Sequence, residues 1–346
     1  MRYKQVYLDW LSHTPMPKDV FDELRDYFVE RCGLPGALHQ WGQWSKAALE
    51  HFIESTQEIL GTKKPIRFSI GPVLPEISKP ILLSPIESKK VKRAVAKSNV
   101  EVFEMKMKGF EFDLEQAEIM LRENDVELII ATAADMVTGT RQPVEKLAKL
   151  AKKHNAKLMV ELSALIGREK FLFDNLGADL GFINGLIIGA PCDLTIGTEP
   201  DQSFPLPLAA AFYKVIAHIN DVLDNKINNL KKLEDYFVKL INLHLEGVER
   251  ISGEKTVPGI VMLSFKGVPR GALSLAIDMQ GIAVWAGDTF EGKIDELAAM
   301  GVKSEIAESA IRFTLWHDNT QDEIDYVLRV VPSIVERIRF ETRKEP

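Results

Sequence analysis

Acidic, basic and imidazole side chains that could do chemistry are spread along the 346-residue chain. Five of them are candidates for one cleft: His13, His39, Asp135, Glu161 and Arg312. Histidines and carboxylates whose pKa values are shifted by their surroundings can act as general acids and bases. The guanidinium of an arginine suits bidentate binding of a carboxylate. One hypothesis is therefore an enzyme whose cleft binds a small acidic or amino-acid-like ligand.

The cysteines and the remaining histidines do not indicate a metal site. The two cysteines, Cys32 and Cys192, are too few for a disulfide framework, and no CxxC pair suggests zinc. Cys192 follows an apolar stretch and is interpreted as a small buried hydrophobe, with a functional role as the alternative. The run Trp316–Asn319 predicts a helix-capping turn, because a metal site would need more ligands close by. No metal is expected.

Composition indicates an ordinary soluble globular protein, with 46% hydrophobic and 27% charged residues. The net charge of -7 argues against a general nucleic-acid binder. The first residues, MRYKQVYLDW, lack the apolar core and cleavage site of a signal peptide. The longest apolar run, near Phe182–Pro191, is too short to span a membrane. We therefore expect a cytoplasmic protein without nucleic-acid or membrane partners.

Strand and helix patterns alternate through the first two thirds of the chain. Strands are predicted at 66–70, 80–84, 101–105, 127–132, 157–162 and 179–183. Helices are predicted at 17–32, 44–60, 86–97, 113–124 and 143–154. This alternation predicts an α/β fold, with a mostly parallel sheet and helices on both of its faces.

The last third reads as a separate, smaller α+β unit. A long helix at 207–248 leads into it, followed by strands at 259–266 and 281–285. Further helices are predicted at 271–279, 303–310 and 321–339. The expected division is a large domain over residues 14–230, and a small domain made of 1–13 together with 231–346.

Six stretches carry motifs in a consistent order. They are VYLDWLSHTP (6–15), GLPGALHQWG (33–42), TGTRQPVEKLAKLAKKHNAKLMVE (138–161), VPGIVMLSFKGV (257–268), DMQGIAVWAG (278–287) and AIRFTLWHDNTQDEIDYVL (310–328). In order and spacing they resemble the cysteine desulfurases, a branch of the class V aminotransferases that uses pyridoxal phosphate (PLP). The resemblance covers nearly the whole chain. It implies a fold-type I PLP-transferase large domain with a smaller C-terminal domain.

The resemblance also indicates which residues stand at the family's catalytic positions. The lysine that holds PLP and transfers protons is matched by Leu186, or by its neighbour Ile187, and neither has an amine. Phe290 stands in place of the sulfur-transferring cysteine. Ser88 replaces a histidine that stacks on the PLP ring, and Glu161 replaces the aspartate that keeps the pyridine nitrogen protonated.

Other pocket positions are retained in part. Arg312 matches the arginine that binds the substrate carboxylate, with a structural ion pair as the alternative role. His39 lies in a retained Leu-His pair, and His13 stands where the family has threonine. Asp135, or its neighbour Met136, replaces an asparagine that bonds the cofactor.

The family's phosphate-binding turn is matched by SIGPVLPE (69–76). Pro72 removes a donor N–H, and Val73 replaces a hydroxyl residue. The crossover that follows is reduced to residues 71–79, shorter than parallel strands normally need. We therefore expect the first strand to pair differently or to leave the sheet. Thr198 is a weak candidate for a threonine that reaches a phosphate across a dimer.

These replacements lie in separate segments. The sequence therefore predicts a non-catalytic homologue that needs no cofactor, forms a homodimer and acts as a binding or scaffold protein. Its expected partner is a sulfur-transfer or iron–sulfur assembly protein. The alternatives are the enzyme with a remodelled cleft described above, or a PLP-dependent transferase whose lysine comes from another segment.

Overall fold

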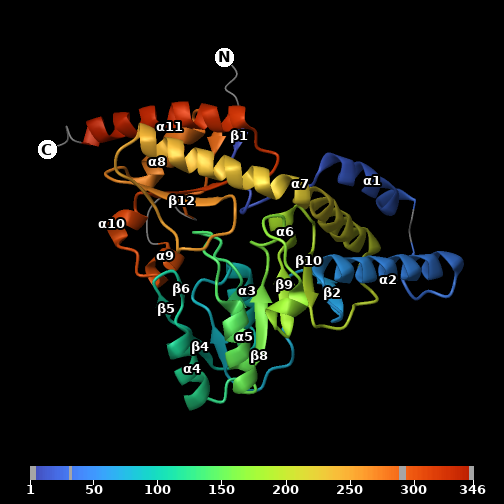
Figure 1. The fold of residues 1–346 in the computed structure, drawn as a ribbon. Coiled ribbons are helices and arrows are strands. Elements are labelled where there is room, and N and C mark those ends of the chain that lie inside the picture. Colours follow the sequence, from blue (N-terminus) through green and yellow to red (C-terminus); the bar gives the residue numbers. More distant parts are fainter. Residues whose placement is uncertain (1–4, 31–32, 288–293, 343–346) are drawn as a thin grey trace.

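A computed structural model describes residues 5–30, 33–287 and 294–342. Its centre is a seven-stranded sheet in the order β2-β10-β9-β8-β7-β3-β4 (Figure 1). The strands are β2 (Ile66–Ser69), β3 (Ile81–Leu83), β4 (Val102–Glu104), β7 (Leu128–Thr132), β8 (Lys157–Glu161), β9 (Leu180–Ile183) and β10 (Asp193–Ile196). Strand β10 is antiparallel to both neighbours, and the other pairs are parallel. The predicted α/β fold with a mostly parallel sheet is confirmed.

Helices cover both faces of the sheet, because successive side chains of a strand point to opposite sides. Leu128 of β7 belongs to the apolar cluster of α3 (Lys89–Val95). The next residue, Ile129, belongs to the cluster of α5 (Val144–Lys153), which packs beside α4 (Leu114–Glu123). The near-continuous apolar sequence of β7 therefore follows from burial on both faces.

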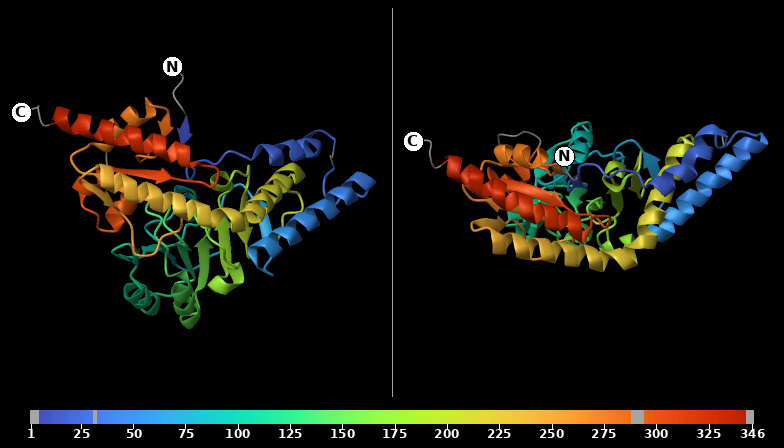
Figure 2. Two further views of the ribbon diagram at one scale, coloured as in Figure 1. Left: turned by 45° about the horizontal axis from the view of Figure 1, so that its top comes forward. Right: turned by 90° about the horizontal axis from the view of Figure 1, so that it is seen from above.

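The long helix α7 (Leu206–His244) connects the sheet to the C-terminal part and changes direction along its length (Figure 2). It packs against α1 (Lys18–Val29) and α2 (Gln40–Leu60), and against α11 (Gln321–Thr342). Its Leu206–Leu223 stretch is long and apolar enough to cross a membrane by length and composition alone. Half of that stretch is buried within the protein, as in the core helix of a globular fold.

The C-terminal part is built on an antiparallel sheet of β11 (Val248–Arg250), β12 (Ile260–Phe265) and β14 (Ala310–Thr314). Helices α8 (Arg270–Asp278) and α11 pack beside it. The N-terminal strand β1 (Val6–Tyr7) joins this part by pairing with β13 (Ile282–Ala283). The short elements are β5 (Met107–Lys108), β6 (Glu111–Phe112), η1 (Phe173–Leu176), α6 (Gly185–Ile188), α9 (Asp295–Ala299) and α10 (Ser304–Ala307). The domain boundaries stay a prediction, and α7 runs without a break through residue 230.

Strand β2 stays in the sheet although no helix follows it. Of the two expected outcomes, leaving the sheet is wrong: β2 is the edge strand and pairs antiparallel with β10, because residues 70–80 reach β3 without a helix. The two strands lie five positions apart, or about 24 Å at the usual strand spacing. A segment of this length reaches roughly 36 Å when extended. Hydrogen bonds from Val73 N to Thr195 Oγ1 and from Ser78 N to Glu127 Oε2 hold it to the fold.

Candidate functional site

Polar residues gather at the edge of the sheet where the parallel strands end. Glu161 ends β8 and Asn184 follows β9, while Asp193 begins the antiparallel β10 at the same edge. Ser163 Oγ donates to Glu161 Oε1 at 3.1 Å and accepts from Asn184 N at 2.9 Å. Lys90 Nζ donates to Asn184 Oδ1 at 2.9 Å. These contacts form a continuous hydrogen-bonded chain from Glu161 to Asp193, called here the polar row. Open α/β sheets place their ligand sites at this edge.

Two buried carboxyl groups meet at one end of the polar row. Glu87 is 0% exposed and Glu161 is 2% exposed. Burial raises the pKa of Glu87 well above its usual range, and the adjacent Glu161 raises it further. Burial also raises the pKa of Glu161, although hydrogen bonds from Ser88 and Ser163 counteract this effect. The pair therefore keeps a proton at pH values where an isolated glutamate has lost it.

Asp193 occupies the other end of the polar row and is 1% exposed. Its Oδ2 accepts from Gly71 N at 2.6 Å, and its Oδ1 accepts from Gly185 N at 2.9 Å. Lys90 Nζ lies 3.0 Å from both oxygens. Two backbone donors and one ammonium group thus compensate this buried carboxylate.

Asp135 and Arg312 form a separate buried cluster nearby. Asp135 Oδ2 accepts from Thr138 N and Thr138 Oγ1, both at 2.6 Å. Burial raises the pKa of Asp135. Arg312 donates from Nη2 to Asp9 Oδ1 at 2.9 Å and from Nη1 to Met136 O at 2.9 Å. The guanidinium is therefore engaged in an ion pair that ties β14 to the N-terminal segment.

The structure does not bring all of the predicted site residues together. His13 is exposed, and His39 caps the start of α2, where its Nδ1 accepts from Gly42 N at 3.1 Å. That end of α2 projects away from the sheet (Figures 1 and 2). Thr198 follows β10, whose antiparallel direction places it at the opposite edge from Glu161. Ser88 caps α3 beside Glu161, so it does lie at the polar row.

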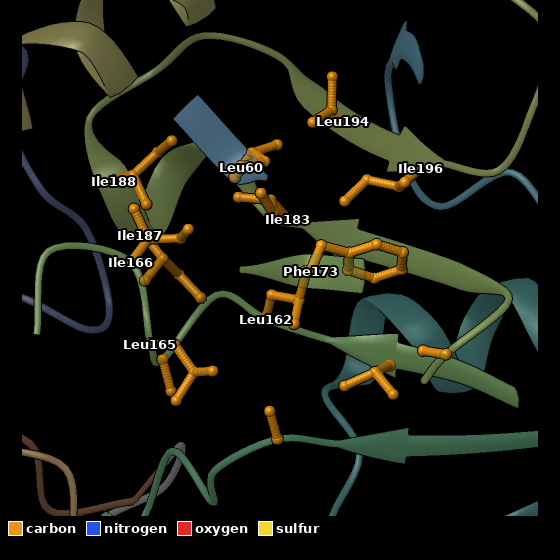
Figure 3. Close-up of a cluster of buried hydrophobic side chains, with 14 of the residues drawn as sticks. Leu60, Leu162, Leu165, Ile166, Phe173, Ile183, Ile187, Ile188, Leu194 and Ile196 are labelled. Atoms are coloured by element: carbon orange, nitrogen blue, oxygen red, sulfur yellow. The ribbon is translucent and has the colours of Figure 1, made fainter. Parts of the chain in front are cut away.

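The residues at the family's lysine position lie in α6. Leu186 is 46% exposed, whereas Ile187 is 6% exposed and lies in the apolar cluster with Ile188 (Figure 3). Phe290, at the family's cysteine position, lies outside the described residues. Cys192 Sγ donates to Leu208 O at 3.3 Å, and burial raises the pKa of this thiol. A thiol in this state is a poor nucleophile.

Sequence reasoning missed Glu87, Lys90 and Asp193. Lys90 lies only two residues beyond Ser88, so its place in the first turn of α3 was a usable signal. Asp193 was overlooked because β10 was not predicted as a strand. No described group of three or more His, Cys, Asp or Glu residues could hold a metal ion.

Comparisons with known proteins point to one family. Residues 84–191 match the aminotransferase class-V family. Cysteine desulfurase IscS of Dictyoglomus turgidum is 24% identical, covering 97% of this chain and 96% of that protein. Cysteine desulfurase NifS of Azotobacter vinelandii is 22% identical, covering 96% and 93%. The X-ray structure of a NifS-like protein from Rickettsia africae has a TM-score of 0.86 at 21% identity, covering 96% and 100%.

These relatives correct the expectation that the chain has no cofactor, because cysteine desulfurases are PLP-dependent and the family points to PLP. The described residues fit one end of that group. Glu161 Oε2 is a buried acceptor with no hydrogen bond of normal geometry, although Ser88 and Glu87 lie beside this carboxyl group, and it suits the N–H of a pyridinium ring. At the other end, the N–H groups of Gly71 and Gly185 already bond Asp193. A phosphate would have to displace that carboxylate, so the phosphate end does not fit as it stands.

Motif order, sheet architecture and the comparisons agree over nearly the full length of the chain. The agreement concerns ancestry and fold, since the relatives share less than a quarter of their residues with it. Residues 84–191 therefore match the aminotransferase class-V family, and nearly the whole chain is similar in sequence and fold to the cysteine desulfurases.

Proposed function

We propose that this chain is a cysteine desulfurase-like protein that does not itself release sulfur from cysteine. It acts instead as a homodimeric binding or scaffold protein in sulfur transfer or iron–sulfur assembly. The observation that carries this proposal is the α6 turn. Leu186 and Ile187 supply no amine there, and Ile187 fills the apolar cluster. An amine at that position is what the family uses to hold PLP and to transfer protons.

The test is a desulfuration assay on the full chain. The purified protein is incubated with PLP and cysteine, and alanine and sulfide are measured against a blank. The Dictyoglomus turgidum relative, assayed in parallel, is the positive control. We expect alanine at the level of the blank, because the turn that follows β9 holds no lysine. Alanine release above the blank by this chain would overturn the proposal.

An apolar surface on the projecting arm supports the homodimer. The arm is α1, the 33–39 loop and the first half of α2. Its exposed apolar residues are Phe21, Phe28, Val29, Leu34, Leu38 and Trp41, and Leu38 is 96% exposed. Several large exposed apolar side chains on one pair of helices are typical of protein interfaces. A two-fold contact between two arms would cover them.

Sedimentation of the full chain tests the homodimer. The variant Leu38→Asp places a charge in the expected interface, so we expect its dissociation constant to rise at least tenfold. Leu243→Asp is the matched control, because Leu243 is also well exposed but lies at the far end of α7. A parent that sediments as a monomer at micromolar concentration would contradict the dimer.

A second candidate function is favoured by Lys90. Its Nζ lies 2.9 Å from Asn184 Oδ1, directly beside the turn that holds the family's lysine position. A PLP-dependent transferase with a displaced lysine would use this amine, which condenses with an aldehyde by losing water. Incubation with PLP, reduction with borohydride and peptide mapping would then find the adduct on Lys90. The variant Lys90→Arg keeps the charge and must lose the adduct; an adduct retained in Lys90→Arg excludes this candidate.

A further inference from the structure

The donors around Asp193 have the geometry of an anion site. They come from three separate segments: Gly71 follows β2, Lys90 lies in α3, and Gly185 begins α6. Both glycine N–H groups point at the carboxylate, and the ammonium group of Lys90 bridges its two oxygens. Backbone N–H groups together with one cation are the donors that proteins use for phosphate.

The backbone fixes this donor set. A Cβ at residue 185 would lie 1.7 Å from the carbonyl oxygen of Cys192, so glycine alone allows this close approach. Gly71 has a φ of +99°, which favours glycine. The register Asp193↔Ser69 between β10 and β2 sets the place of the carboxylate. The site therefore does not depend on flexible loops for its shape.

A groove of about 690 Å³ opens beside these donors. Gly71 and Lys90 line it, together with Glu76, Arg93 and Lys97. Among the described residues, neither Arg93 nor Lys97 has an ion-pair or side-chain hydrogen-bond partner. The groove reaches the Gly71 and Lys90 side of the site, whereas Gly185 and Asp193 are buried behind it, and its cations outnumber its carboxylate.

We propose that Asp193 is a built-in competitor at an oxyanion site formed by Gly71 N–H, Gly185 N–H and the Lys90 ammonium group. The ligand class of that site is inorganic phosphate or a phosphate monoester. In the parent chain the carboxylate occupies the donors and repels a second anion. Without it, both N–H groups and the ammonium group lose their acceptor, and two of these donors, on Gly71 and Lys90, lie at the groove. The proposal does not depend on the proposed function, since it concerns phosphate binding and not turnover.

Titration calorimetry with inorganic phosphate tests the competition in the full chain. Asp193→Ser empties the space, so we expect its phosphate affinity to exceed that of the parent at least tenfold. Asp193→Asn removes the charge but keeps the shape, and a gain of about threefold is expected. Asp193→Asn still tests the proposal if Asp193→Ser does not fold. Adding Lys90→Met to either variant must abolish the gain.

Asp201→Asn is the matched control, because Asp201 pairs with Arg67 on the surface and its loss changes net charge equally. Parallel titrations with PLP and with pyridoxal separate an effect on phosphate from an effect on the ring. The Asp193 variants should bind PLP more tightly than the parent does, but they should bind pyridoxal no more tightly. The proposal is overturned if the parent and both Asp193 variants bind phosphate alike, or if Asp201→Asn gains as much. The proposal is also overturned if the gain in phosphate affinity persists after Lys90→Met, or if the affinity for pyridoxal rises in the same way.

Discussion

The two ends of the polar row bury acidic groups in opposite ways. Asp193 is surrounded by donors: two backbone N–H groups and the ammonium group of Lys90. Within the described part of the chain, Glu87 has no cation or backbone N–H on its oxygens: Lys92 and Ser84 lower its pKa only in part, and Lys92 bonds Pro85 O instead. Burial raises the pKa of Glu87, so protonation takes the place of pairing.

This difference determines how each end responds to mutation and to pH. Removing the cation from the Asp193 end should destabilise the fold, because a buried charge is left without compensation. The Glu87 end should lose stability when its proton dissociates as pH rises. Three variants can break or sharpen this comparison.

The largest effect is expected from Lys90→Met. The substitution leaves Asp193 buried with only two N–H donors, and breaking a buried pair typically costs about 3–5 kcal/mol. Because the Lys90 side chain is partly exposed, we expect a loss of about 2–3 kcal/mol, measured by urea unfolding at pH 7. Lys79→Met is the control, since Lys79 pairs with Asp125 on the surface and its loss should change stability little. Equal stability of Lys90→Met and the parent would contradict the pairing role.

The next effect is expected from Glu87→Gln, and it depends on pH. The folded pKa of Glu87 lies above its ordinary value of 4.5. Its contribution to stability is thus fully present below that value and is lost as pH rises through the folded pKa. The glutamine side chain of the variant does not ionise, so the variant should be more stable than the parent at pH 8 and differ little from it at pH 4. Urea unfolding across this range measures it. A variant less stable than the parent at pH 8 would show that Glu87 is ionised and paired.

Much of the fold was predictable because its signals are local. The six predicted strands from 66–70 to 179–183 all match observed strands, and the central ones, β7, β8 and β9, are the buried apolar runs typical of parallel strands. Strand β10 was missed because its pairing with β2 joins residues more than 120 positions apart. Its sequence, DLTI, begins with an aspartate that strands generally disfavour. The donors of Gly71, Gly185 and Lys90 compensate that aspartate, and they assemble only in three dimensions.

The residues of the site were predictable only where the order of the sequence motifs located them. Glu161 and Ser88 were placed at the polar row by resemblance, and the structure has them there. Lys90 lies two residues beyond Ser88, but its role could not be inferred in this way, because its partner Asp193 lies 103 residues further along the chain. His39 was also placed at the site by motif order. Within a single chain, however, it caps the start of α2 on the arm. Spacing along a sequence does not say which segments meet when the sheet forms.

The smallest effect is expected from Ser163→Ala, which tests whether the two ends are coupled. Ser163 Oγ joins them by accepting from Asn184 N and donating to Glu161 Oε1. Loss of a buried hydroxyl bond of this kind costs about 1 kcal/mol. If the row acts as one network, Ser163→Ala and Lys90→Met should be non-additive by about 0.5 kcal/mol or more in urea unfolding. Ser333→Ala on α11, far from the row, should be additive with Lys90→Met. Additivity for Ser163→Ala as well would mean that each end is stabilised independently, so the contrast between paired and protonated acids would then hold without any connection between them.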